Sequence, residues 1–169
     1  MRQGKPAAGG VRARQLEVRY MAGVDVPDAA PLRTPLQIAA VLRPIMEGRL
    51  VEALVVLHLD ARHRLIGYEV SAIGALNVVH VSPRDVYRSA LTVGAAAIIV
   101  SHNHPSGDAS PSPDDLELTR RLRAAADLIG VPMLDHIVMG DGFYSFSEER
   151  LVHTPPAPSV LNPGSHRTT

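Results

Sequence analysis

The amino-acid sequence predicts an α/β or α+β fold in which helices flank a mixed β-sheet. Two observations support this class. Through the middle of the chain, stretches with helical spacing of apolar residues alternate with short apolar stretches typical of buried strands. On either side, neighbouring strand-like stretches are separated by short turns, which indicates hairpins. The 169 residues favour a single domain, and aromatic residues make up only 4% of the chain, which predicts an aliphatic core.

The two ends of the chain are expected to lie outside this domain. Residues 1–14 combine small residues with scattered arginines and predict a disordered arm. Residues 154–169 are rich in proline and predict a disordered tail. The single domain is therefore predicted to cover residues 15–153.

Three helix starts share one signal, a hydroxyl side chain followed directly by proline, at Thr34, Ser82 and Ser112. The hydroxyl caps the first turn, and proline suits the first helical position because its missing N–H needs no partner there. Pro44 predicts that the first helix kinks or ends near Arg43. The residues expected to face inward are Ile38, Val41, Leu42, Ile45, Val86, Ala90, Leu91, Leu118, Leu122, Ala125 and Ile129.

Strands are predicted where apolar and polar residues alternate, or where a short stretch is almost continuously apolar. These stretches are 16–20, 51–59, 64–71, 77–81, 95–104, 133–139 and 143–146. The second and third are expected to form a hairpin, and so are the last two.

Charge and cysteine content exclude several classes of function. Seventeen basic and seventeen acidic residues cancel, so the chain lacks the basic character typical of nucleic-acid binding. It has no cysteine, which fits a reducing cytoplasm and means that any zinc ligands must be histidines and carboxylates. No apolar stretch approaches the roughly 20 residues that span a bilayer. We expect a cytoplasmic protein with no membrane partner; nothing in the sequence indicates its oligomeric state.

The stretch Ser101 to Asp115 carries the chemistry. Alternate strand residues share a face, so His102 and His104 are expected to point the same way. Pro105 favours extended backbone at the preceding residue and so keeps His104 in that register. A short loop rich in Gly, Pro and Ser then returns the chain towards the histidines.

The helix start after this loop has two explanations. Capping alone accounts for the Ser-Pro-x-Asp pattern at Ser112, because the same pattern occurs at Ser82, where no histidine pair precedes it. The histidine pair upstream, His102 and His104, distinguishes the pattern at Ser112 from the one at Ser82. We predict that His102, His104 and Asp115 bind one Zn²⁺ whose fourth ligand is a water activated for hydrolysis. Ser112 is the nearest hydroxyl in sequence to meet a developing oxyanion.

The residues His-Asn-His-Pro-Ser-Gly, followed by Ser-Pro-Asp-Asp, resemble the JAMM motif of JAB/MPN zinc metalloproteases, and more closely the RadC branch of that superfamily. The resemblance covers roughly residues 34–150. It implies the JAB/MPN (cytidine-deaminase-like) architecture, zinc ligands at His102, His104 and Asp115, and a serine at Ser112 that helps stabilise the tetrahedral intermediate. Full-length members commonly carry a helix-hairpin-helix segment ahead of this domain, and we expect none in this chain.

The resemblance also implies a glutamate upstream that acts as general base. The candidates are Glu47, Glu52 and Glu69. Glu52 is favoured because it fits the family pattern ahead of the first hairpin strand. In addition, a carboxylate at the entrance to a buried strand is the one least explained as an ordinary solvent-exposed charge. Glu69 lies within a strand, where an outward-facing position would account for it.

The predicted function is a zinc-dependent metallopeptidase that cleaves peptide or isopeptide bonds in a peptide or protein substrate. Zinc deaminases are excluded because the chain has no cysteine to bind their zinc. H-E-x-x-H proteases are excluded because no histidine is followed by a glutamate. The alternative is a metal-binding accessory protein of DNA repair or metabolism without proteolytic activity. His136, in an apolar stretch, is expected to be a core histidine rather than a fourth ligand.

Overall fold

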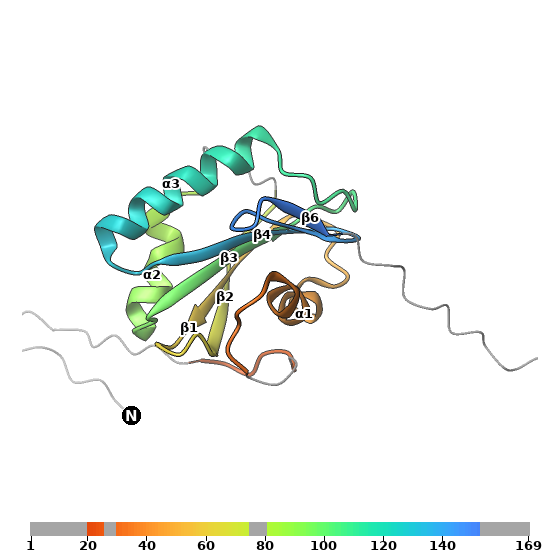
Figure 1. Cartoon of the computed structure of the whole chain (residues 1–169). Helices are drawn as coiled ribbons and strands as arrows, with labels where there is room; N and C mark the ends of the chain where they lie inside the picture. The colour runs from red at the N-terminus through yellow and green to blue at the C-terminus, as the bar shows by residue number, and fades with distance from the viewer. Residues whose placement is uncertain (1–19, 26–29, 75–80, 153–169) are drawn as a thin grey trace, which may run out of the picture.

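The computed structural model describes residues 20–25, 30–74 and 81–152, which form a mixed sheet between helices, as predicted (Figure 1). Within these residues, six strands are arranged in the order β2-β1-β3-β4-β5-β6, and only β3 and β4 pair in parallel. The elements are α1 (Pro35–Met46), β1 (Ala53–Leu59), β2 (Leu65–Ile73), α2 (Pro83–Val93), β3 (Ala97–Asn103), α3 (Pro113–Ile129), β4 (Met133–Met139), β5 (Phe143–Ser145) and β6 (Arg150–Val152).

All three predicted helix starts are confirmed. The hydroxyls of Thr34, Ser82 and Ser112 each accept a hydrogen bond from the backbone N–H three residues later, and proline follows each cap. Gly94 and Gly130 end α2 and α3 in left-handed conformation, which lets the chain turn sharply into the strand that follows.

Two details of the helices differ from the prediction. Of the two outcomes expected at Pro44, a kink or an end near Arg43, the end is not observed. Helix α1 continues through Pro44 to Met46, because the last turn still closes through the Glu47 N–H and the Arg43 carbonyl at 2.8 Å. In α2, Leu91 is 56% exposed rather than inward. Tyr87 is buried in its place, and its hydroxyl donates to the Leu122 carbonyl of α3 at 3.1 Å.

The hairpins β1–β2 and β4–β5 are confirmed as antiparallel pairs. Strand β6, which the sequence pattern did not predict, adds a short antiparallel edge beside β5. Most of the predicted strand 16–20, nearly all of the predicted strand 77–81, and the arm 1–14 and tail 154–169 lie outside the described residues. No helix in the part of the chain that the structure describes is long and apolar enough to cross a membrane.

The core lies in two layers, one on each face of the sheet. Helix α1 covers one face and packs on alternate residues of β1 and β3, such as Val55 and Ile99. Helices α2 and α3 cover the other face and pack on Leu54 and Val100 (Figure 1). Strands β1 and β3 are buried along their whole length, which explains why both are almost continuously apolar.

Candidate metal centre

The end of β3 presents two histidines on the face of the sheet that α2 and α3 cover. His102 pairs with Leu54 of β1, and Val100, two residues before it, packs in the core beneath α2 and α3. Because alternate strand residues share a face, His102 points to that side, and His104 follows two residues later. The His104 backbone N–H donates to the Met139 carbonyl at 2.8 Å, so pairing with β4 continues past the end of the strand.

The first turn of α3 brings Asp115 to these histidines. The Ser112 hydroxyl accepts from the Asp115 N–H at 3.2 Å and donates to Asp115 Oδ2 at 2.7 Å. The Ser112 backbone N–H donates to the same oxygen at 2.7 Å. The capping box therefore fixes the carboxylate while it satisfies the helix terminus.

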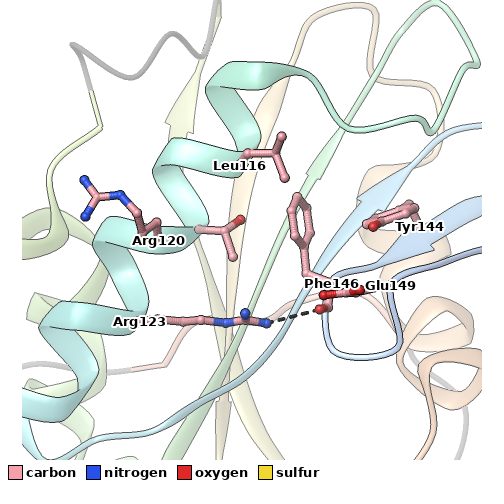
Figure 2. A pocket seen from close by; sticks show the side chains of 7 residues that line it. Leu116, Arg120, Arg123, Tyr144, Phe146 and Glu149 are labelled. Carbon is pink, nitrogen blue, oxygen red and sulfur yellow. Dashed lines mark hydrogen bonds between the residues drawn. The ribbon is translucent and has the colours of Figure 1, made fainter.

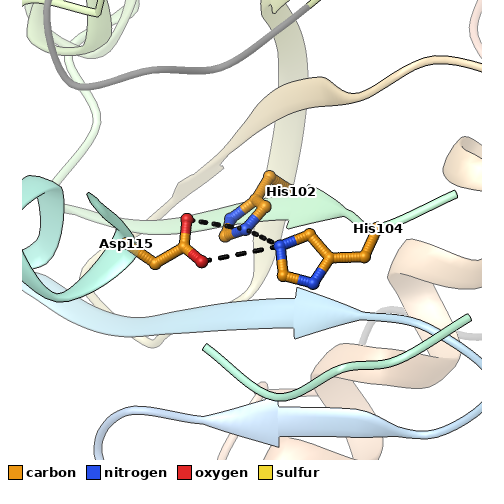
Figure 3. A group of neighbouring side chains, drawn as sticks. All are labelled: His102, His104 and Asp115. Carbon is orange, nitrogen blue, oxygen red and sulfur yellow. Dashed lines mark hydrogen bonds and ion pairs between the residues drawn. The ribbon is translucent and has the colours of Figure 1, made fainter. Parts of the chain in front are cut away.

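The three side chains converge on one point (Figure 3). His102 Nε2 lies 3.0 Å from Asp115 Oδ1 and 3.1 Å from His104 Nε2, and His104 Nε2 lies 3.5 Å from Asp115 Oδ2. His104 Nδ1 donates to the Asp108 carbonyl at 2.7 Å, because a carbonyl oxygen can only accept. In a neutral ring this leaves the Nε2 lone pair of His104 directed at the other two groups.

This donor set fits a zinc ion. Ligands at about 2.0–2.1 Å from a tetrahedral ion are separated by about 3.3 Å, close to the spacings found here. Imidazole nitrogen and carboxylate oxygen are both ordinary zinc ligands. His102, His104 and Asp115 could therefore hold one metal ion.

The charge states of these groups favour a cation. Burial raises the pKa of the Asp115 carboxyl, but its interactions with the neighbouring His102 and His104 outweigh burial and hold the pKa well below its usual range. The hydrogen bond to Asp115 raises the pKa of His104 despite burial, with smaller contributions from the Asp108 carbonyl and the charge of Glu52. Asp115 is therefore a carboxylate at neutral pH, and its charge attracts a metal ion.

The structure separates the three candidate glutamates. Glu52 lies directly before β1, two residues before Leu54, which pairs with His102 of β3, and its charge helps to raise the pKa of His104. Glu47 is the C-cap of α1, the helix that covers the opposite face of the sheet. Glu69 lies in β2, with Oε1 3.8 Å from an Arg88 nitrogen of α2. Of the three, Glu52 is the one that the fold brings to the candidate centre.

Residues without an assigned role in the sequence-based prediction also support the centre. His136 is fully buried, which confirms the expected core histidine, but its Nε2 lies 2.9 Å from His102 Nδ1. Thr119 of α3 and Asn103, between the two motif histidines, are also buried and hydrogen-bonded at the site. The only signal in the sequence is general: polar side chains in buried elements need partners.

A pocket of about 470 Å³ opens next to these residues, between α3 and the segment from β5 towards β6 (Figure 2). Phe146 stacks on His136 with ring centroids 4.9 Å apart, and the Arg123 guanidinium donates to the Phe146 carbonyl at 3.2 Å. Leu116 follows Asp115 directly in α3. The lining residues are Leu116, Thr119, Arg120, Arg123, Tyr144, Phe146 and Glu149.

Comparison with known proteins gives a consistent family. Residues 32–151 match the sequence model described as the RadC-like JAB domain. A UPF0758 protein of Trichormus variabilis is 43% identical over 115 residues, which cover 68% of this chain and 47% of that protein. A UPF0758 protein of Xylella fastidiosa is 42% identical over 137 residues, covering 80% and 61%. One from Methanosarcina acetivorans is 41% identical over 120 residues, covering 70% and 52%.

The names of these relatives state no activity, and the chain spans about half the length of the first of them. The matched region contains every element from α1 to β5 and all three residues of the candidate metal centre. On this match, the chain belongs to the family of RadC-like JAB domains.

Proposed function

We propose that this protein is a zinc-dependent hydrolase that cleaves peptide or isopeptide bonds. The observation that carries the proposal is the convergence of His102, His104 and Asp115 within hydrogen-bond distance of one another. Glu52 lies two residues before Leu54, which pairs with His102. Three protein ligands leave a fourth tetrahedral position for water, which distinguishes a catalytic zinc site from a closed structural one.

A bound zinc ion would supply an acidified water and would polarise the substrate carbonyl. The chain itself must then move one proton. Glu52 would accept it from the attacking water and deliver it to the leaving amine as the carbon–nitrogen bond breaks. Glu52 is half-buried directly before the fully buried β1, which suits a carboxylate that must meet both water and substrate.

Ser112 would stabilise the developing oxyanion. Its hydroxyl hydrogen is directed to Asp115 Oδ2 at 2.7 Å, so this role requires the hydroxyl to rotate towards the substrate. The Ser112 backbone N–H remains on the same carboxylate oxygen and can keep Asp115 in place meanwhile.

The pocket beside α3 offers a subsite for a substrate side chain. Leu116, Tyr144 and Phe146 provide apolar and aromatic surface, whereas Arg120 and Glu149 provide charges of opposite sign. This composition suits a side chain of a peptide, with an apolar body packed against Leu116 and the two rings (Figure 2).

Metal analysis tests the first part of the proposal. Purified protein loaded with Zn²⁺ and then desalted is expected to retain one ion per chain, and His102→Ala and Asp115→Ala are expected to lose it. His63→Ala, at a half-buried position in the bend between β1 and β2, is the matched control and should keep the ion. Equal zinc in the wild type and in both site variants would refute the site assignment.

Turnover of peptide and isopeptide substrates tests the second part. Glu52→Gln should retain zinc and lose hydrolysis, whereas Glu47→Gln should retain both. Loss of hydrolysis in Glu69→Gln but not in Glu52→Gln would move the general base to Glu69. A zinc-loaded wild type that cleaves no peptide or isopeptide bond would refute the hydrolase and favour a metal-binding accessory protein.

A further inference from the structure

A chain of buried hydrogen bonds lies behind His102, on the side away from Asp115 and His104. His102 Nδ1 lies 2.9 Å from His136 Nε2, and His136 Nδ1 lies 2.6 Å from Thr119 Oγ1. The Thr119 hydroxyl donates to the Asp115 carbonyl at 2.6 Å. All of these side chains are buried, so water does not compete for the bonds.

The direction of each bond follows from the end of the chain. The Asp115 carbonyl can only accept a hydrogen bond, so the Thr119 hydroxyl donates its hydrogen to it. The Thr119 oxygen must therefore accept from His136 Nδ1. A neutral imidazole has one N–H, so His136 Nε2 is an acceptor. His102 Nδ1 must therefore carry the hydrogen, which leaves Nε2 of a neutral His102 as a lone pair directed at the candidate metal centre.

His136 is fully buried, and each of its ring nitrogens has one polar partner, His102 Nδ1 or Thr119 Oγ1. A charged His136 would donate from both nitrogens and would break this sequence of donors and acceptors.

We propose that Thr119 and His136 are positioning residues that hold His102 in the tautomer with hydrogen on Nδ1, so that Nε2 is ready to bind metal. The inference rests on the proposed function only in requiring that the centre binds a metal ion. A partner that fixes the tautomer and orientation of a histidine ligand typically increases metal affinity by roughly 10–100-fold.

Thr119→Val and Thr119→Ser form the matched pair that tests the inference. Valine has the shape of threonine without the hydroxyl, so His136 can move its hydrogen to Nε2, which forces the His102 hydrogen onto the metal-binding nitrogen. Zinc affinity of Thr119→Val, measured by competition with a chromophoric chelator, is expected to fall by roughly 10–100-fold. Thr119→Ser, which keeps the hydroxyl, should restore it.

Ring-nitrogen chemical shifts from ¹⁵N NMR of histidine-labelled protein report which nitrogen of His102 carries the hydrogen. They would not change if Thr119 and His136 only stabilised the fold. The wild type in chelator is expected to show His102 with hydrogen on Nδ1, and Thr119→Val to show a shift towards hydrogen on Nε2. Thermal unfolding in chelator is measured beside it, so that a loss of fold is separated from a loss of ligand orientation.

A second pair addresses His136 directly. Gln can present an oxygen acceptor to His102 Nδ1, whereas Leu cannot, so His136→Gln should bind zinc more tightly than His136→Leu. Unchanged zinc affinity in both Thr119→Val and His136→Leu, with an unchanged His102 tautomer, would overturn the inference. Because no substrate is used, failure of peptide hydrolysis would leave this result standing, and weak zinc binding by the wild type would identify failure of the metal centre itself.

Discussion

The side chain of Asn103 holds the backbone on both sides of Glu52. Its Oδ1 accepts from the Ala53 N–H at 2.8 Å, and its Nδ2 donates to the Val51 carbonyl at 3.2 Å. The Glu52 carbonyl in turn accepts from the Gly74 N–H at 2.8 Å. The middle residue of the His-x-His motif therefore fixes the segment that carries the proposed general base, while its neighbours form the metal centre.

Asn103→Ala is expected to reduce turnover more than it reduces zinc affinity. It leaves the buried Ala53 N–H without its acceptor, which costs about 1–3 kcal/mol of unfolding free energy, and it loosens the Glu52 backbone. Substrate turnover, chelator competition and urea unfolding measure the three effects. Asn103→Asp restores the acceptor and should recover part of the loss in stability; wild-type turnover in Asn103→Ala would contradict a positioning role.

Ser112→Ala and Ser82→Ala separate capping from function. Both serines are N-caps followed by proline and by an aspartate three residues later, and Ser82 caps α2 rather than α3. Each substitution is expected to cost about 1 kcal/mol of unfolding free energy. Only Ser112→Ala should also lower kcat for hydrolysis, because only Ser112 contacts Asp115. Equal activity in the two variants would show that Ser112 is a cap alone.

Gly140→Ala is expected to weaken zinc binding through the loop that holds His104. A Cβ at position 140 would clash with the Gly107 carbonyl oxygen, so the backbone of that loop must move. The Asp108 carbonyl, which accepts from His104 Nδ1, belongs to the same segment. Chelator competition and thermal unfolding measure the effect.

Gly67→Ala is the matched control for this substitution. The atoms nearest to a Cβ there belong to the ring of Tyr20, a half-exposed side chain that can rotate away. Its zinc affinity should therefore equal that of the wild type. A Gly140→Ala variant with unchanged zinc affinity would show that the loop adapts without moving His104.

Asp60 is expected to contribute to stability in a defined pH range. The Arg64 backbone N–H and side chain donate to its carboxylate and lower the pKa of Asp60 to about 2. Because the folded pKa lies below the unfolded value of about 3.9, the contribution is fully present above that value and disappears as pH falls through about 2. The difference in urea midpoint between the wild type and Asp60→Asn, with chelator present, should shrink over this range. A pH-independent difference would refute the assignment.

Tyr144→Ala tests the pocket as a substrate subsite. Removing the ring should raise KM for peptide substrates while zinc affinity stays at the wild-type value, because Tyr144 lines the pocket and is not a candidate ligand. Leu128→Ala, on α3 but 89% exposed, is the control and should change neither quantity. Unchanged KM across a panel of peptides would show that substrate does not occupy the pocket.

The sequence by itself determined the local parts of this protein. Strand alternation places His102 and His104 on one face, and a hydroxyl-proline start places Asp115 in the first turn of α3. Both rest on contacts between residues a few positions apart, and both can therefore be predicted from the sequence alone. The same local rules predicted Leu91 inward and failed, since the packing of Tyr87 against α3 decides which face of α2 is buried.

Only the tertiary structure decided what surrounds the histidines. Asn103 meets Ala53 because β1 pairs with β3 in one register, and His136 meets His102 because β4 lies parallel to β3. Thr119 joins them only because α3 packs over that same face. These partners are 17 to 50 residues apart in sequence. Sheet register and helix packing, which arise from the burial of the whole core, bring them together, and no local pattern encodes them.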